Sequence, residues 1–311
     1  MIVIGTRGSK LALWQANHIR GQLQTHFPDL EVHIEIIKTT GDRLQAVAAA
    51  DVSSYASAGI SAKGAFSKEI DQAQLEAKID VAVHSLKDLS TDLPVGLTLG
   101  AIPIREDARD MLISKNRSEL AGLRSGEKVG TRSLRRQTQL HYHRPDLEVV
   151  GLRGNVDTRI RKLHETDLSA IILATAGLNR LFGSPPTLPD LELTPIPTDQ
   201  MVPAVGQGAL AVVTRTDDVH TLDLLKRIDD PISRAEVVAE RTALATMASE
   251  TELGAGCQIP IGIYAKYTLT TLQMVGVICS ERGLKRVSVE GSIDDPISIG
   301  QQMGQQLLTF N

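Results

Sequence analysis

The sequence predicts an α/β protein made of two similar halves followed by a third, smaller unit. Gly-Thr-Arg occurs at residues 5–7 and again at 130–132, each time after a short apolar run and before a helix-like segment. Two further strand-like segments recur in the same order: 31–42 with 148–155, and 80–85 with 169–174. Each half therefore puts an arginine where a strand turns into a helix, so a cleft between them would be lined by anion-binding groups.

The first half begins with alternating strands and helices. Ser9 is a favoured N-cap residue, and apolar residues at 12, 16, 19 and 23 form one stripe of a helix running to Phe27. Residues 32–37 alternate as a strand, and the Ser/Ala-rich stretch 47–62 predicts a mobile surface loop. A helix is expected near residues 67–77.

The apolar run 79–83 predicts a parallel strand that is buried on both faces. It ends at His84-Ser85-Leu86-Lys87-Asp88. Ligands of open α/β sheets bind at the carboxyl ends of strands, so these residues are placed for chemistry.

The second half begins near residues 105–110 and ends near the proline-rich segment 185–203. The strand at 209–214 is expected to return to the first half, because a hinged pair of lobes needs two crossing segments. In the third unit, Ser233 and Glu236 predict a capping box before a helix through Met247. A hairpin (272–278 with 286–289) and a closing helix (297–308) follow. The predicted domains are 1–103 plus 204–226, 104–203, and 230–311.

Composition limits the class of ligand. The 311 residues carry a net charge of −4 and only 3% aromatic residues, which disfavours a nucleic-acid surface and favours a small polyanion in a cleft. Two cysteines, no signal-like N-terminus and no membrane-length apolar run predict a cytosolic protein that crosses no membrane. No histidine pair has metal-ligand spacing, so no metal is expected.

Arginines gather at the predicted strand-to-helix turns: Arg7, Arg132, Arg135, Arg136, Arg153, Arg159 and Arg180. Three of them begin one predicted helix, where cations meet the positive end of the helix dipole at a cost of roughly 0.3–1 kcal/mol each. A bound anion would offset this cost. The alternative is a solvated basic helix face paired with nearby acids.

Two further side chains could carry chemistry. Asp88, just past a buried strand, could act as an acid/base or stabilise a developing cation, or it could be a turn or N-cap residue. Cys257, among glycines, could be a nucleophile or an attachment point, or a small buried loop residue. We expect His84 to be a hydrogen-bonded structural residue and Cys279 to be a core residue.

Several motifs in one order resemble those of the hydroxymethylbilane synthase (porphobilinogen deaminase) family. They are Gly5-Thr6-Arg7, residues 11–16, Val83–Asp88, Arg105-Glu106-Asp107, Ser133–Gln137, Leu152–Val156, Pro203–Gly208 and the Cys257 loop. The resemblance implies two lobes like those of periplasmic binding proteins and a third small α/β domain. It implies a dipyrromethane cofactor joined to Cys257 by a thioether. Four porphobilinogen units are then added with loss of ammonia, and hydrolysis releases hydroxymethylbilane.

The resemblance also assigns roles to residues. Asp88 matches the catalytic aspartate, which would stabilise the cation left when ammonia departs. Matches to cofactor-binding positions are Ser85, Lys87, Thr131, Ser133, Arg135, Arg136, Arg153, Gly154 and Asn155. Matches to substrate-binding positions are Arg7, Ser9, Lys63, Arg159 and Arg180. The family is usually monomeric.

The chain departs from the family pattern at several positions. Gly59 stands where lysine is common, Asn179 stands where lysine or another basic residue is common, and Arg132 replaces a small hydroxyl residue. The cysteine loop has Gly254 and Ala255 in place of Glu and Gly, and the segment from 240 to 257 is longer than usual. A non-catalytic anion-binding module is the main alternative, and a nucleic-acid-binding protein is a third.

Overall fold

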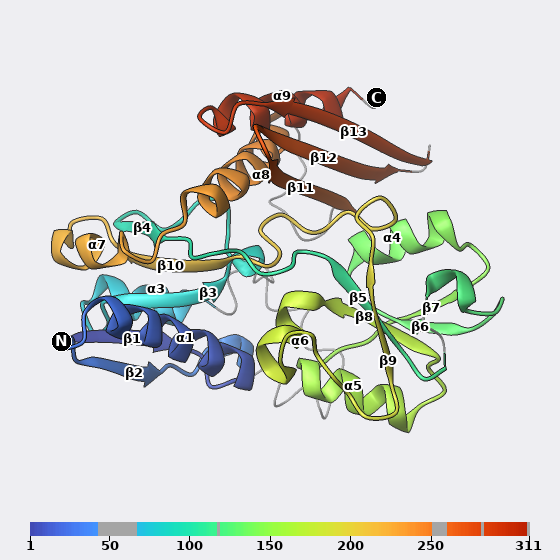
Figure 1. Cartoon of the computed structure of the whole chain (residues 1–311), viewed down its shortest axis with the longest axis horizontal. Helices are drawn as coiled ribbons and strands as arrows, with labels where there is room; N and C mark the ends of the chain where they lie inside the picture. Colours follow the sequence, from blue (N-terminus) through green and yellow to red (C-terminus); the bar gives the residue numbers. More distant parts are fainter. Residues whose placement is uncertain (43–66, 117–118, 251–259, 281–282, 310–311) are drawn as a thin grey trace. The chain divides into compact units, whose positions relative to one another are not determined.

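A computed structural model describes residues 1–42, 67–116, 119–250, 260–280 and 283–309 (Figure 1). The chain divides into two compact units, Met1–Arg105 with Ala209–Arg234, and Glu106–Gly208 with Ala235–Asn311. No helix in the described part of the chain combines the length and apolar character needed to cross a membrane. The predicted loop at 47–62 lies outside the described residues.

The first unit is built on a mixed sheet of order β2-β1-β3-β10-β4. Its strands are β1 (Ile2–Thr6), β2 (Val32–Ile36), β3 (Val81–Ser85), β4 (Leu97–Ala101) and β10 (Leu210–Arg215). Strands β2, β1 and β3 are parallel, and β10 is antiparallel to β3 and β4. The prediction that the strand after residue 208 returns to the first half is confirmed.

Two helices of this unit lie where the sequence analysis expects them, α1 (Lys10–His26) and α3 (Lys68–Leu75). The 3₁₀ turn η2 (Leu86–Asp88) and the helix α7 (Val219–Leu225) were not predicted. Ser9 caps α1, because its Oγ accepts a hydrogen bond from the Ala12 N–H at 3.3 Å. The predicted stripe of α1 buries Ala16, Ile19 and Leu23 against the sheet, as expected for an amphipathic helix.

The second unit contains a sheet of the same pattern, β7-β6-β8-β5-β9. Its strands are β5 (Asp110–Ser114), β6 (Lys128–Gly130), β7 (Glu148–Val150), β8 (Ala170–Ala174) and β9 (Glu192–Ile196). Strand β5 is antiparallel to its neighbours, while β7, β6 and β8 are parallel. The helical elements are η3 (Leu120–Gly122), α4 (Leu134–His143), α5 (Val156–Glu165) and α6 (Thr175–Phe182).

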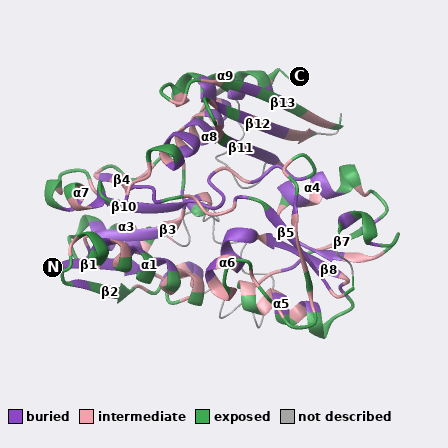
Figure 2. Cartoon of the chain, viewed as in Figure 1, coloured by how far each residue is buried: buried purple, intermediate pink, exposed green. Residues whose placement is uncertain are grey.

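A three-stranded antiparallel sheet of order β11-β12-β13 completes the second unit. It consists of β11 (Ile261–Thr268), β12 (Thr271–Ser280) and β13 (Gly283–Gly291), covered by α8 (Pro231–Glu250) and α9 (Pro296–Leu308). In the two mixed sheets, buried residues concentrate on the inner strands, such as β3, β10, β5 and β8 (Figure 2). The α/β class with two similar mixed sheets and a third small α/β part is confirmed; the domain boundaries remain a prediction.

Three sequence expectations need correction in this last part. Helix α8 begins earlier than predicted, and its first turn is capped by Asp230, which accepts from the Ser233 N–H at 2.8 Å. Ser233 and Glu236 therefore form no capping box, and each accepts a hydrogen bond from a distant backbone N–H instead. Strand β11 was not predicted, although its alternation buries Ile261, Ile263 and Ala265. Cys279 lies in the predicted strand but is half-buried, not a core residue.

Candidate functional site

In the first unit, the predicted site residues follow two neighbouring parallel strands. Strands β1 and β3 pair directly, so their carboxyl ends lie at one edge of the sheet. Arg7 and Ser9 follow β1, whereas Ser85 ends β3 and is followed by Lys87 and Asp88. The structure thus brings five of the predicted residues to one sheet edge.

Asp88 is an exposed carboxylate on a fixed backbone. It ends the turn η2, whose first residue Leu86 is 1% exposed and anchors the turn in the core. The Leu89 N–H closes the turn by donating to the Leu86 carbonyl at 3.1 Å. No hydrogen bond joins the Asp88 carboxylate to another described residue, so the carboxylate is accessible to a ligand.

Arg7 is oriented by an acid that the sequence analysis did not single out. Its Nε and Nη2 donate to Asp42 Oδ1 at 3.0 and 2.5 Å. Burial opposes ionisation of Asp42, but hydrogen bonds from Arg7 and Thr39 outweigh it and lower the pKa of Asp42. Asp42 therefore stays ionised and holds the guanidinium at the strand end.

His84 lies in β3, and its Nε2 is fully buried without a hydrogen-bond partner among the described residues. The expected hydrogen bond is thus missing at this nitrogen. Burial, with a smaller contribution from the positive charge of Arg7, lowers the pKa of His84 to about 4. The imidazole is neutral at physiological pH.

This pKa predicts that stability falls on mild acidification. The unfolded chain takes up a proton at His84 near pH 6.5, whereas the folded chain does so only near pH 4. The contribution of the neutral His84 to the free energy of unfolding is therefore complete above about pH 6.5 and is lost as the pH falls. At pH 5 the loss is on the order of 1–2 kcal/mol. Urea unfolding at pH 7.5 and 5.0 measures it. In His84→Gln the loss of unfolding free energy between pH 7.5 and 5.0 should be smaller by this amount. An equal loss in both proteins would contradict the lowered pKa of His84.

In the second unit, three parallel strands end at one edge and carry most of the predicted cofactor-binding residues. Thr131 and Ser133 follow β6, the turn Arg153-Gly154-Asn155 lies between β7 and α5, and α6 follows β8. Ser133 and Asn155 stand at the N-caps of α4 and α5 without a side-chain capping bond. Their hydroxyl and amide groups are therefore free of that capping role.

The turn before α5 requires glycine. Gly154 has φ +120°, and a Cβ there would lie 2.7 Å from the Cγ2 of Thr158. Its carbonyl accepts from Arg159 Nε at 2.7 Å, so Arg159 is folded back onto this turn. Arg153, Gly154 and Arg159 are thus brought together.

Arg135 and Arg136 are not on a solvated helix face. Each is 5% exposed, and both contact the fully buried carboxylate of Asp110 at 2.7 Å. Gln207 Nε2 donates to the same carboxylate at 2.9 Å. Arg132, in contrast, is exposed.

Arg180 is also buried, and it contacts backbone rather than solvent. Its Nη2 donates to the Gly208 carbonyl at 2.7 Å. Burial, opposed in part by the charge of Glu106, lowers the pKa of Arg180 to about 10, so the side chain remains a cation. The neighbouring Asn179 donates from Nδ2 to Glu106 Oε1 at 3.0 Å.

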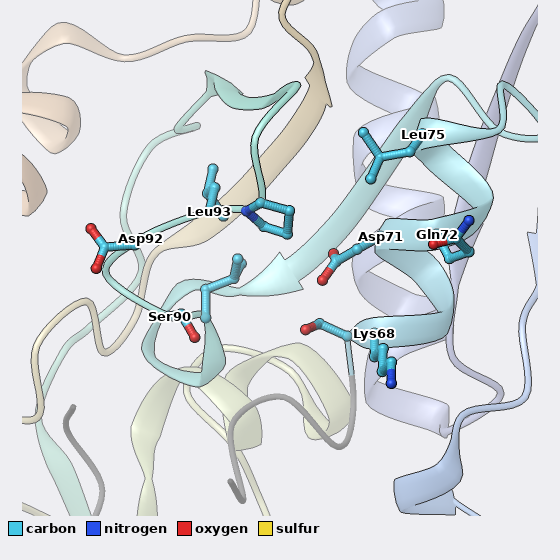
Figure 3. A pocket seen from close by; sticks show the side chains of 10 residues that line it. Lys68, Asp71, Gln72, Leu75, Ser90, Asp92 and Leu93 are labelled. Atoms are coloured by element: carbon cyan, nitrogen blue, oxygen red, sulfur yellow. The ribbon is translucent and has the colours of Figure 1, made fainter. Parts of the chain in front are cut away.

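A pocket of about 510 Å³ opens in the first unit between α3 and the segment 89–94 (Figure 3). The carboxylate of Asp71 points into it, and burial, weakly opposed by a hydrogen bond from Ser67, raises the pKa of Asp71. None of the predicted site residues lines this pocket. Its lining does include Leu89 and Ser90, the two residues that directly follow Asp88.

Lys63 and Cys257 lie outside the described residues, as does Gly59. Sequence reasoning missed Asp42, Asp110 and Gln207 as partners of the arginines. Gln207 belongs to the motif Pro203–Gly208. No local spacing connects residue 110 with residues 135 and 136, which meet it only in the folded chain.

Two family models match the chain. One, described as porphobilinogen deaminase, dipyromethane cofactor binding domain, matches residues 2–223, and the porphobilinogen deaminase C-terminal domain matches 234–309. The porphobilinogen deaminase of Syntrophomonas wolfei is 43% identical over 304 residues, covering 98% of this chain and 92% of the relative. That of Trichlorobacter lovleyi is 43% identical over 307 residues, with the same coverage.

Solved structures give a weaker likeness. The second substrate binding domain of a putative amino acid ABC transporter from Streptococcus pneumoniae matches at 11% identity and a TM-score of 0.44, covering 72% of this chain and 90% of that one. A likeness at this level adds nothing to the assignment from sequence.

Proposed function

The chain belongs to the porphobilinogen deaminase family, and from that premise we propose which of its residues carry the activity. That activity serves tetrapyrrole biosynthesis: four porphobilinogen units are joined on a dipyrromethane primer, ammonia is lost, and hydroxymethylbilane is released by hydrolysis. Each unit carries carboxylates, so the growing chain accumulates negative charge.

The exposed carboxylate of Asp88 is the observation that carries the catalytic assignment. It stands on a fixed turn at a strand end, between Lys87 and the buried Leu89, with no described partner to neutralise it. A carboxylate so placed can stabilise the positive charge that forms on porphobilinogen as ammonia leaves, and can accept or return the pyrrole proton. We assign Asp88 this role.

The donors of the second unit fit a carboxylate-bearing cofactor. Thr131, Ser133, Arg153 and Asn155 stand at neighbouring strand ends, where N–H and O–H groups bind carboxylate oxygens. Arg135 completes this set, while the buried Arg136 and Arg180 contribute positive charge. When bound through Cys257, the dipyrromethane supplies the pyrrole end that accepts each new unit.

Porphobilinogen is the proposed small-molecule partner. We assign its carboxylates to Arg7, Ser9, Lys63, Arg159 and Arg180, as the family resemblance implies. A monomer acting in the cytosol is part of the same proposal. A non-catalytic anion-binding module would give Asp88 and Cys257 no role.

The intact mass of the purified chain tests cofactor attachment. We expect a mass excess equal to two linked pyrrole units, because the primer is held by a thioether. Cys257→Ala should remove the excess, and Cys279→Ala should keep it, since these are the two cysteines of the chain. A wild-type chain that shows no excess even after incubation with porphobilinogen would refute the proposal.

A further inference from the structure

The neighbouring arginines Arg135 and Arg136 use their N–H groups differently. Arg136 gives its Nε–Nη2 edge to Asp110 Oδ1 at 3.0 and 2.7 Å, and Nη1 to the Ile172 carbonyl at 2.9 Å. Arg135 donates from Nη1 alone, to Asp110 Oδ2 at 2.7 Å and to the Val202 carbonyl at 2.6 Å. Among the described residues, the Nε–Nη2 edge of Arg135 has no hydrogen-bond acceptor.

The free Nε–Nη2 edge of Arg135 is not completely buried. Neither Nε nor Nη2 of Arg135 is among the fully buried unpaired polar atoms of the described chain. The Nε–Nη2 edge of a guanidinium binds a carboxylate through two parallel hydrogen bonds. The Nε–Nη2 edge of Arg135 can therefore bind a ligand, whereas the same edge of Arg136 is already hydrogen-bonded to Asp110.

The net charge of Asp110, Arg135 and Arg136 also favours binding of an anion. Burial opposes ionisation of Asp110, but Arg135 and Arg136 outweigh it and hold the pKa of Asp110 far below its ordinary value. Two guanidinium groups thus share one carboxylate, which leaves an excess positive charge in a buried place. Such a charge is costly unless an anion accompanies it.

We propose that Asp110 is a positioning residue: it anchors Arg135 through Nη1, so that the free Nε–Nη2 edge faces a carboxylate of the dipyrromethane primer. Arg136 and Gln207 hold Asp110 in turn, from the other carboxylate oxygen. This inference rests on the proposed function.

Charge and geometry make opposite predictions for Asp110→Asn. Removing the carboxylate raises the local positive charge, which by itself would attract an anionic primer more strongly. Removing it also releases the Arg135 guanidinium, so the two-point contact with a carboxylate is lost. We expect geometry to dominate, because charge-assisted bidentate hydrogen bonds depend on alignment.

The experiment measures primer loading instead of turnover. Full-length apoprotein, produced in cells that make no porphobilinogen, is incubated with porphobilinogen, and intact mass gives the concentration for half-maximal loading. For Asp110→Asn we expect this concentration to rise roughly tenfold. Gln207→Leu, which loosens Asp110 but keeps both ion pairs, should raise it by a smaller factor and covers the case in which Asp110→Asn does not fold.

Glu236→Gln is the matched control. Glu236 is also a buried carboxylate of the second unit, but it accepts from the Tyr267 N–H at 2.9 Å and touches neither arginine. It should lower the melting temperature without changing the loading concentration. An unchanged or lower loading concentration in both the Asp110 and Gln207 variants would overturn the inference, whereas a wild-type chain that never loads would overturn the proposed function itself.

Discussion

Asp88→Asn is expected to lower kcat by roughly 10²–10⁴-fold, the range in which a positioned acid/base or charge-stabilising group contributes to a rate. The amide keeps the shape of the side chain but can neither balance a developing cation nor take up a proton at neutral pH. Steady-state assays with porphobilinogen measure the loss. Intact mass should show that the primer is still attached.

Asp88→Asn should leave the stability of the fold nearly unchanged. Asp88 is exposed and no described residue bonds its carboxylate, so the free energy of unfolding should shift by no more than about 0.5 kcal/mol. Asp92→Asn is the control, because Asp92 is an exposed carboxylate shortly after the same turn. If Asp88→Asn kept the wild-type rate, or if Asp92→Asn lost as much, Asp88 would not be the catalytic carboxylate.

Gly208→Ala is expected to cost at least about 3 kcal/mol of unfolding free energy. Gly208 has φ +91°, and a Cβ there would lie 2.3 Å from the backbone oxygen of Glu106. The obstacle is backbone, which cannot rotate away as a side chain could. The carbonyl of Gly208 also accepts from Arg180, so the displacement would disturb a predicted substrate-binding arginine as well.

Gly126→Ala separates backbone strain from the clash. Gly126 belongs to the same unit and has a similar φ of +79°, but a Cβ there would meet no atom within 4 Å. Its cost should be only the left-handed strain of about 1–2 kcal/mol. Denaturant unfolding of both variants measures the difference, and equal losses would show that the contact with Glu106 is not the cause.

Local pattern predicted several of the helices and strands, but not how their ends are paired. The N-cap of α1 could be predicted at Ser9 because its partner, the Ala12 N–H, is three residues away. The capping box at Ser233 failed although its spacing was right, since Asp230 caps the helix one turn earlier and Ser233 instead bonds Arg105. A distant partner can override a local motif when both offer a hydrogen bond of similar strength.

The site divides along the same line. Asp88 and the strand-end arginines could be proposed from the sequence, because repeated strand-to-helix turns and the family motifs are written in consecutive residues. The sequence could not show which of these arginines keep free N–H groups for a ligand. Arg135 and Arg136 are adjacent in the chain and identical in kind, yet only Arg135 keeps a free binding edge.

The amino-acid sequence alone thus determined the α/β class, the two similar halves, the family and its chemistry. These depend on periodicity and on motifs of neighbouring residues. Only the tertiary structure decided that Asp110 joins two arginines, that Asp42 holds Arg7, and that the Nε2 of His84 is buried without a described partner. These features depend on contacts between residues far apart in the chain. Such contacts form when sheet and helices pack together, and no spacing along the sequence encodes them.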